Sequence, residues 1–141
     1  MADAPDDFDW VGAQATCNTT AMFERLRTRV HEDVNKRNAL LDRPGGWRFE
    51  FSEEEDGHFE VARVVGGSLT DPQVSAVVRF DRAGGRIHVV CEDTDVDFTA
   101  IVTSDASGAC RFVVGEAMYS DWEIRKMALE VLFFEDTAES G

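Results

Sequence analysis

The chain has 141 residues, of which 43% are hydrophobic and 30% charged, and its formal net charge is −14. This length suits one domain with its own core, and the composition excludes a wholly disordered chain and a membrane protein. The excess of acid repels phosphate backbones and anionic lipid headgroups, so nucleic acid and membranes are not expected partners. The first residues are acidic where a secretory signal needs positive charge, which predicts a cytoplasmic protein.

The N-terminal part of the chain is predicted to hold an acidic segment followed by a long helix. Residues 1–15 carry four aspartates and little periodicity, so we expect a mobile segment there. Between about Thr20 and Leu41, apolar residues recur at the spacing of one buried helix face. Pro44 and two glycines end this helix. The residues of its buried face are Phe23, Leu26, Val30, Val34 and Leu41.

After Gly46 apolar and polar residues alternate, which is typical of strands with one buried face. Short turn sequences such as Asp56-Gly57 separate six such runs and predict an antiparallel meander. Arg63 breaks the alternation of the second strand, which indicates a β-bulge or an arginine that points to the core side. The predicted inward residues are Trp47, Phe49, Phe51, Phe59, Val61, Val74, Ala76, Val78, Phe80, Ile87, Val89, Cys91, Phe98, Ala100, Val102, Cys110, Phe112 and Val114.

A second helix is predicted from about Asp121 to Phe134. It follows the sequence SDWE, typical of a capping box in which the Ser120 hydroxyl accepts from the Glu123 amide and the Glu123 carboxylate binds back. Apolar residues cover most of the circumference of this helix and leave only one narrow polar stripe. This apolar surface is too wide for one sheet face to cover. We therefore expect a homodimer whose interface includes Leu129, Leu132 and Phe133.

These elements predict an α+β fold in which an N-terminal helix and a C-terminal helix pack on one face of a curved, six-stranded antiparallel sheet. Residues 16–136 form the single domain, and residues 137–141 are expected to be a disordered tail. Such a sheet can leave a pocket beneath its helices. Arg63 and Tyr119 are the polar residues that we expect to anchor a ligand there.

Metal, cysteine and histidine sites are not predicted. The sequence EDTDVDF, residues 92–98, lacks the glycine and glutamate that a calcium-binding loop would need at Phe98 and Ser104, so it is interpreted as a turn. The three cysteines are an odd and sparse set, which predicts reduced thiols. The three histidines, His31, His58 and His88, fall on separate elements. No phosphate-binding loop, dinucleotide fingerprint or nucleophile elbow occurs, so no cofactor and no catalytic residue are predicted.

The outer face of the predicted sheet is the more informative surface. It combines aliphatic residues with basic ones, and this mixture favours either a solvated strand face or a protein-binding surface. It lacks the aromatic residues that an RNA-binding sheet would present. The basic residues are Arg48, Arg79, Arg86, His88 and Arg111.

The preferred hypothesis is therefore a small, acidic, non-catalytic protein-binding or accessory domain, of the chaperone or adaptor kind, that associates with itself. The alternative hypothesis is a small-molecule-binding protein, or an enzyme without a recognisable motif, that uses the pocket beneath the helices.

Overall fold

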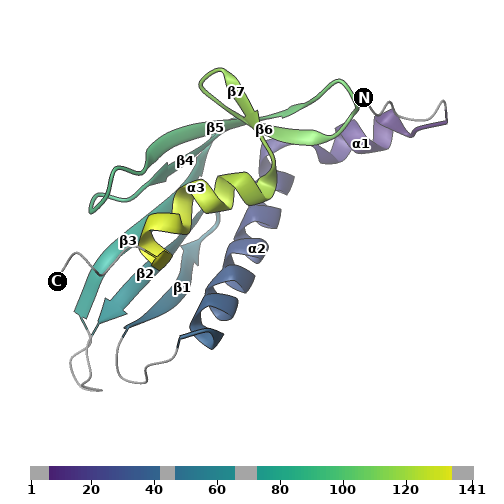
Figure 1. Ribbon diagram of the computed structural model, residues 1–141. Coiled ribbons are helices and arrows are strands. Elements are labelled where there is room, and N and C mark those ends of the chain that lie inside the picture. The colour runs from purple at the N-terminus through teal and green to yellow at the C-terminus, as the bar shows by residue number, and fades with distance from the viewer. Residues whose placement is uncertain (1–6, 42–46, 66–72, 135–141) are drawn as a thin grey trace.

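Figure 1 shows the computed structural model, which describes residues 7–41, 47–65 and 73–134. The fold is α+β, as predicted, with α2 and α3 on the same face of an open antiparallel sheet (Figure 1). The elements are α1 (Trp10–Thr16), α2 (Thr19–Ala39), β1 (Trp47–Glu55), β2 (His58–Val65), β3 (Gln73–Ala83), β4 (Arg86–Val90), β5 (Asp97–Ser104), β6 (Cys110–Val114), β7 (Ala117–Tyr119) and α3 (Asp121–Phe134).

The seven strands lie in the order in which they occur along the chain, from β1 to β7. The sequence predicted six of them and missed β7, whose three residues are too few to show an alternation. The turn between β1 and β2 is built as expected, because Gly57 has a φ of +83°. A meander of this kind brings neighbouring strands together with short connections, so each inward residue lies next to the inward residues of the adjacent strands.

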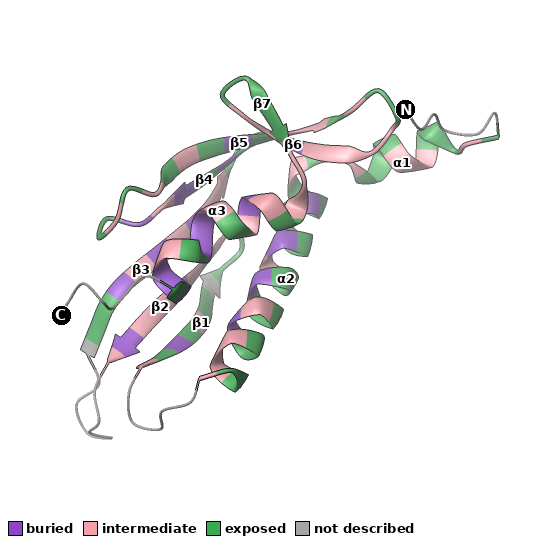
Figure 2. Cartoon of the chain, in the orientation of Figure 1, coloured by how far each residue is buried: buried purple, intermediate pink, exposed green. Residues whose placement is uncertain are grey.

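The core lies between the sheet and the two long helices. Figure 2 shows buried residues on the sides of α2 and α3 that face the sheet and exposed residues on their outward turns. Phe59 in β2 stacks on Phe80 in β3, with ring centroids 4.5 Å apart, and Phe23 in α2 packs on Phe59 at 5.1 Å. Burying each such side chain contributes about 1.5 to 3 kcal/mol. The largest fully buried side chains include Phe23, Phe49, Phe59, Phe80 and Phe112.

One predicted inward residue, Val74, is on the outside with 59% of its surface exposed. Arg63 pairs with Ala76 but Val64 pairs with Val74, so the register shifts by one residue and Ser75 is the extra residue of a β-bulge. A shift of one residue turns the following side chains to the opposite face. The extra residue is in β3, whereas β2 pairs with β1 without a break at Arg63, so the alternative of an arginine that points to the core side is confirmed. The inward prediction for Val74 is wrong.

Arg63 also reaches the helix side of the sheet, where it fixes the end of α3. Its guanidinium lies 4.8 Å over the Trp47 ring and donates to the Ser75 hydroxyl at 2.8 Å and, at 3.5 Å, to the Leu132 carbonyl. Arg37 in α2 donates to the Phe133 carbonyl at 3.1 Å. The last turn of α3 has no basic residue of its own. Cations from β2 and α2 thus satisfy carbonyls that a helix end leaves without partners.

The other end of α3 begins at Asp121, as predicted. The Glu123 carboxylate accepts from the Ser120 amide at 2.8 Å and from the Ser120 hydroxyl at 3.0 Å. The serine hydroxyl therefore donates to the carboxylate, where the capping-box prediction had it accept from the Glu123 amide. These hydrogen bonds from Ser120 lower the pKa of Glu123 below its usual value.

Two of the three cysteines form a disulfide, which contradicts the prediction of reduced thiols. Cys17, between α1 and α2, is bonded to Cys110 at the start of β6, and only Cys91 is free, buried in the core. The prediction rested on the number of cysteines. It had no means of placing Cys17 beside β6.

The short helix α1 is a further feature that the sequence did not predict, since residues 1–15 were expected to be mobile. Its N-terminus is capped by Asp9, whose side chain accepts from the Gly12 amide at 2.9 Å. Phe8 packs on the turn between β5 and β6, where a Cβ at Gly108 would lie 2.7 Å from the Phe8 ring. In that turn the side chain of Asp105 accepts from the Ser107 hydroxyl and from the amides of Ser107 and Ala109, which lowers its pKa to about 2.

The acidic sequence EDTDVDF is a turn between β4 and β5, as predicted. The backbone amide of Cys91 donates to the Val96 carbonyl at 2.9 Å, and the backbone amide of Thr94 donates to the Cys91 carbonyl at 3.2 Å. Asp97 begins β5. Within the described part of the chain, no group of three or more His, Cys, Asp or Glu side chains is placed to hold a metal ion.

Candidate functional site

A groove lies between α2 and α3, and its lining is largely apolar. It has a volume of about 370 Å³ and is lined by residues of both helices. Its walls are formed by residues at helical spacing. On α3, Trp122, Lys126, Leu129 and Phe133 follow one another at intervals of four, three and four residues. The groove therefore extends over most of the length of α3.

An ion pair in the wall of the groove joins α2 and α3. The Arg125 guanidinium donates to both carboxylate oxygens of Asp33 in α2, at 2.8 and 2.7 Å, and to Asp121 in α3 at 2.8 Å. Burial lowers the pKa of Arg125, but the bonds to the two carboxylates outweigh it and the pKa is raised. Only 16% of the Arg125 side chain is exposed. A guanidinium that contacts three carboxylate oxygens on two helices fixes the spacing of the helices, and hence the width of the groove.

The floor of the groove is apolar and belongs to the core. Leu129, Leu132 and Phe133, predicted to need a second surface, are only 2%, 1% and 6% exposed. The Phe133 ring packs on Phe49 in β1 at 4.8 Å. Because α3 lies against both the sheet and α2, the chain itself supplies that second surface. The expectation that these three residues require another subunit is wrong, and self-association through them loses its reason.

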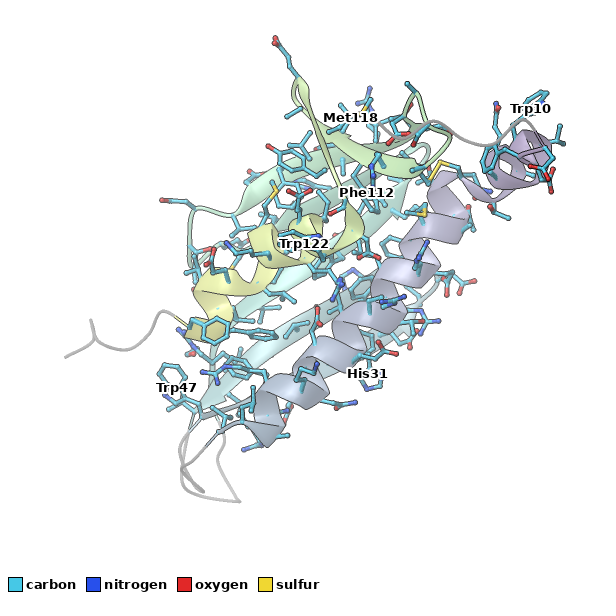
Figure 3. The ribbon with its side chains drawn as sticks, turned by 45° about the vertical axis from the view of Figure 1, so that its right-hand side comes forward. Trp10, His31, Trp47, Phe112, Met118 and Trp122 are labelled. Carbon is cyan, nitrogen blue, oxygen red and sulfur yellow. A yellow bond between two sulfur atoms is a disulfide. The ribbon has the colours of Figure 1, made fainter. Side chains whose placement is uncertain are left out.

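The rim of the groove carries apolar side chains that the core does not cover. Leu40 at the end of α2 is 64% exposed, and Trp122 and Phe134 on α3 are 58% and 63% exposed. These are three of the eight large hydrophobic residues that are exposed in the described part of the chain. Trp122 lies on α3, far from Trp10 and Trp47 (Figure 3). Trp122 and Phe134 lie toward opposite ends of α3, so exposed aromatic side chains border the groove along its length, as is typical of a binding surface.

The charge of the groove is opposite in sign to that of the whole chain. Four cationic and two anionic side chains line it, and the Arg125–Asp33 pair neutralises one of each. Lys126 pairs with Glu130 at 3.1 Å, but both side chains are more than half exposed, so this pair is weak. Among the described residues, Lys36 and Arg37 have no carboxylate within ion-pair distance, and Arg37 lies over the Phe134 ring at 4.5 Å.

The outer face of the sheet, by contrast, is balanced in charge. The five predicted basic residues all lie on the face away from the helices, but four of them have a carboxylate within 4 Å. Arg48 pairs with Glu50, Arg79 with Glu60 and Glu92, His88 with Asp97, and Arg111 with Asp105; Arg86 has no such partner among the described residues. The bases predicted for this face are therefore largely offset by carboxylates from the strands and from the adjoining turns. Protein binding through these residues stays a prediction.

Two of the three histidines share this outer face. His58 is opposite Asp81 in β3, and Asp81 is opposite His88 in β4. Hydrogen bonding to Asp81 and, less strongly, to Glu60 raises the pKa of His58 against the opposing effect of burial. His31 lies elsewhere, on α2, stacked on Phe51 at 4.4 Å. Sequence reasoning had not placed His58 and His88 together, because their shared row depends on the register of two strand pairs.

The predicted ligand anchors Arg63 and Tyr119 do not meet. They lie in β2 and β7, with four strands between them in the sheet order. Arg63 is engaged at the end of α3, and Tyr119 packs against the core cluster. The residues that line the α2–α3 groove were missed by the sequence analysis. The sequence does hold a signal for them. Asp33, Lys36, Arg37 and Leu40 recur at helical spacing and form a second stripe beside the buried stripe of α2.

Comparison of the chain with protein-family models, with curated proteins and with solved structures finds no match. None of the described helices combines the length and the apolar character that crossing a bilayer requires.

Proposed function

We propose that the chain is a non-catalytic protein-binding domain and that the α2–α3 groove is its binding surface. The observation that carries this proposal is the groove itself, whose apolar floor is bordered by three exposed apolar side chains, Leu40, Trp122 and Phe134. A partner segment that covers them buries apolar surface, which contributes about 25 cal/mol per Å² before the costs of association. On the sheet face, Ile101 and Met118 lie in one row across β5, β6 and β7 with Val113 between them, and Val74 lies apart on β3. We prefer the groove because its exposed apolar side chains border a concave surface with an apolar floor.

Panning a library of random peptides of about 16 residues against the immobilised full chain tests this proposal. Fluorescence anisotropy then gives the Kd of each selected peptide. We expect Trp122→Ala and Phe134→Ala each to weaken binding about tenfold or more, as truncation of a central aromatic residue does. Ile101→Ala and Met118→Ala are matched controls, because they remove exposed apolar side chains from the sheet side. Loss of binding in the controls alone would overturn the proposal, as would selection of no peptide.

Self-association stays a prediction, because the structure contains a single chain. A second copy in the groove would form a closed dimer only if the same surface met itself. That arrangement would bring the cations of both grooves to one interface, which is unfavourable. Light scattering during size-exclusion chromatography measures the mass directly. A dimer that Trp122→Ala converts to a monomer would show that the groove binds a second copy and would contradict the present assignment.

A cytoplasmic location also stays a prediction, and the Cys17–Cys110 bond gives a specific reason to test it. Disulfides persist mainly in oxidising compartments. Mass spectrometry after thiol alkylation of the protein from its own cells measures the fraction of the bond that is formed there.

A further inference from the structure

We propose that the groove selects an acidic partner, namely a short segment of another protein that carries apolar side chains flanked by aspartate or glutamate. This inference rests on the proposed function and adds the chemistry of the ligand. Its starting point is that cations stand on both walls, with Lys36 and Arg37 on α2 and Lys126 on α3. A segment that places apolar side chains on the floor will hold its flanking residues beside these cations.

Judged from the described residues, two of the four cations of the groove, Lys36 and Lys126, are available to a ligand. Lys36 has no carboxylate in ion-pair distance among the described residues, and Lys126 has only the exposed Glu130. Exchanging one exposed carboxylate partner for another costs little, because a pair of this kind contributes at most about 1 kcal/mol. Arg125 is different, since Asp33 and Asp121 occupy its guanidinium. The ligand is therefore expected to meet Lys36 and Lys126 and to leave Arg125 and Arg37 in place, since Arg37 donates to the Phe133 carbonyl.

The net charge of the chain does not prevent an acidic ligand from binding. At physiological ionic strength the Debye length is about 8 Å, so charges farther away are largely screened and the adjacent cations dominate. The same reasoning disfavours a basic ligand, which would place like charges beside the rim. Affinity for an acidic segment should then fall as salt is added, because the local attraction is screened. If repulsion by the whole chain governed binding, added salt would raise the affinity instead.

The peptide library of about 16 random residues supplies the test, because its selected sequences report the preferred charge. We expect the peptides that require Trp122 to be enriched in aspartate and glutamate around aromatic or aliphatic residues. The double variant Lys36→Glu with Lys126→Glu should raise the Kd of these peptides about tenfold or more. The same variant, used as the panning target, should select peptides enriched in lysine and arginine.

The matched control is Arg48→Glu with Arg86→Glu, which changes the net charge by the same amount on the outer face of the sheet. Both residues are exposed and lie on the face away from the groove. We expect this control to bind acidic peptides as the natural chain does. Equal weakening by both double variants would show a general charge effect and overturn the inference.

The two proposals fail in different ways. Selected peptides that need Trp122 but carry no excess of acid would overturn the charge inference and leave the protein-binding groove intact. Peptides that bind without Trp122 and lose affinity in the outer-face variant would overturn both, and would assign binding to the sheet.

Discussion

At its N-terminal end α3 is held by residues next to it in the sequence, whereas at its C-terminal end it is held by arginines from two other elements. Ser120 and Glu123 bond to each other within one turn. At the other end, Arg37 and Arg63 reach Phe133 and Leu132 from 96 and 69 residues away. The first end is encoded locally and can form with the helix. The second exists only after α2, β2 and α3 have packed together.

This difference bears on the groove, because its apolar rim lies near both ends of α3. Trp122 is near the N-terminal end, which is capped locally. Phe134 lies beside Arg37 at the C-terminal end, which is held by tertiary contacts. Changes at the C-terminal end should therefore disturb the groove more than changes at the cap. Four predictions, in order of expected size, test this view.

The largest effect is expected for Arg125, which takes part in both kinds of contact, since Asp121 is on its own helix and Asp33 is on α2. Arg125→Met keeps the bulk of the side chain but leaves the partly buried Asp33 without a cation and Asp121 with only Arg25, at 3.9 Å. We expect a loss of about 2 to 3 kcal/mol in the free energy of unfolding, measured by urea denaturation. Arg125→Lys keeps the charge without the forked geometry of the guanidinium. Its free energy of unfolding should lie between those of the natural chain and Arg125→Met. A stability equal to that of the natural chain would show that the pair is dispensable.

The next effect is expected for the arginines at the C-terminal end. Arg63→Met and Arg37→Met each remove a cation from carbonyls of the last turn of α3 and should cost about 1 to 2 kcal/mol. Arg29→Met is the control, because Arg29 is exposed on α2 and has no ion pair with a described residue. Amide hydrogen exchange should rise in the last turn of α3 and not in its first. Uniform exchange along the helix would contradict a separate C-terminal clamp.

A smaller effect is expected at the cap. Glu123→Ala removes the acceptor for the Ser120 amide, whereas Glu123→Gln keeps a neutral acceptor at the same place. The free energy of unfolding should fall less for Glu123→Ala than for either arginine variant, and less again for Glu123→Gln. Glu116→Ala, in the exposed turn before β7, serves as the control. A loss for Glu123→Ala larger than that for Arg63→Met would reverse the proposed order.

The smallest effect is a dependence on pH that separates the two ends. The pKa of Glu123 is lowered in the folded chain, so its contribution is complete above its ordinary pKa of 4.5 and is lost as pH falls through the folded pKa. Arginine does not titrate in this range. The stability difference between the natural chain and Glu123→Gln should therefore shrink in acid, while the difference for Arg63→Met stays constant. A constant difference for both would show that the Glu123 bond does not depend on its charge.

The sequence was sufficient wherever a local rule decides the structure. Alternation placed Phe59, Ala76 and Phe112 on the inner face, and the start of α3 at Asp121 followed from the residues of its cap. The core-side position of Arg63 was also visible, because one arginine broke the pattern of its strand. The outward position of Val74 was not, since the extra residue is in β3 rather than in the strand of Arg63.

The candidate site was beyond sequence reasoning, because each of its parts depends on a contact between distant elements. The apolar width of α3 indicated that two surfaces cover it, but the sequence did not show that α2 is one of them. In the same way the excess of acid hid the cations of the groove, which stand out only when residues 36, 37 and 126 are brought together. Helix spacing identifies which residues share a face, and only the packing identifies which faces meet.

The bond between Cys17 and Cys110 makes a covalent ring of the chain between them, 93 residues apart in sequence. α2 and the first five strands lie within this ring, while α1, β7 and α3 are appended to it. Closing a ring of this size restricts the unfolded chain by roughly 4 to 5 kcal/mol in the chain-entropy model. A protease that cuts a turn between two of the enclosed strands should leave fragments that migrate as one band until a reducing agent separates them.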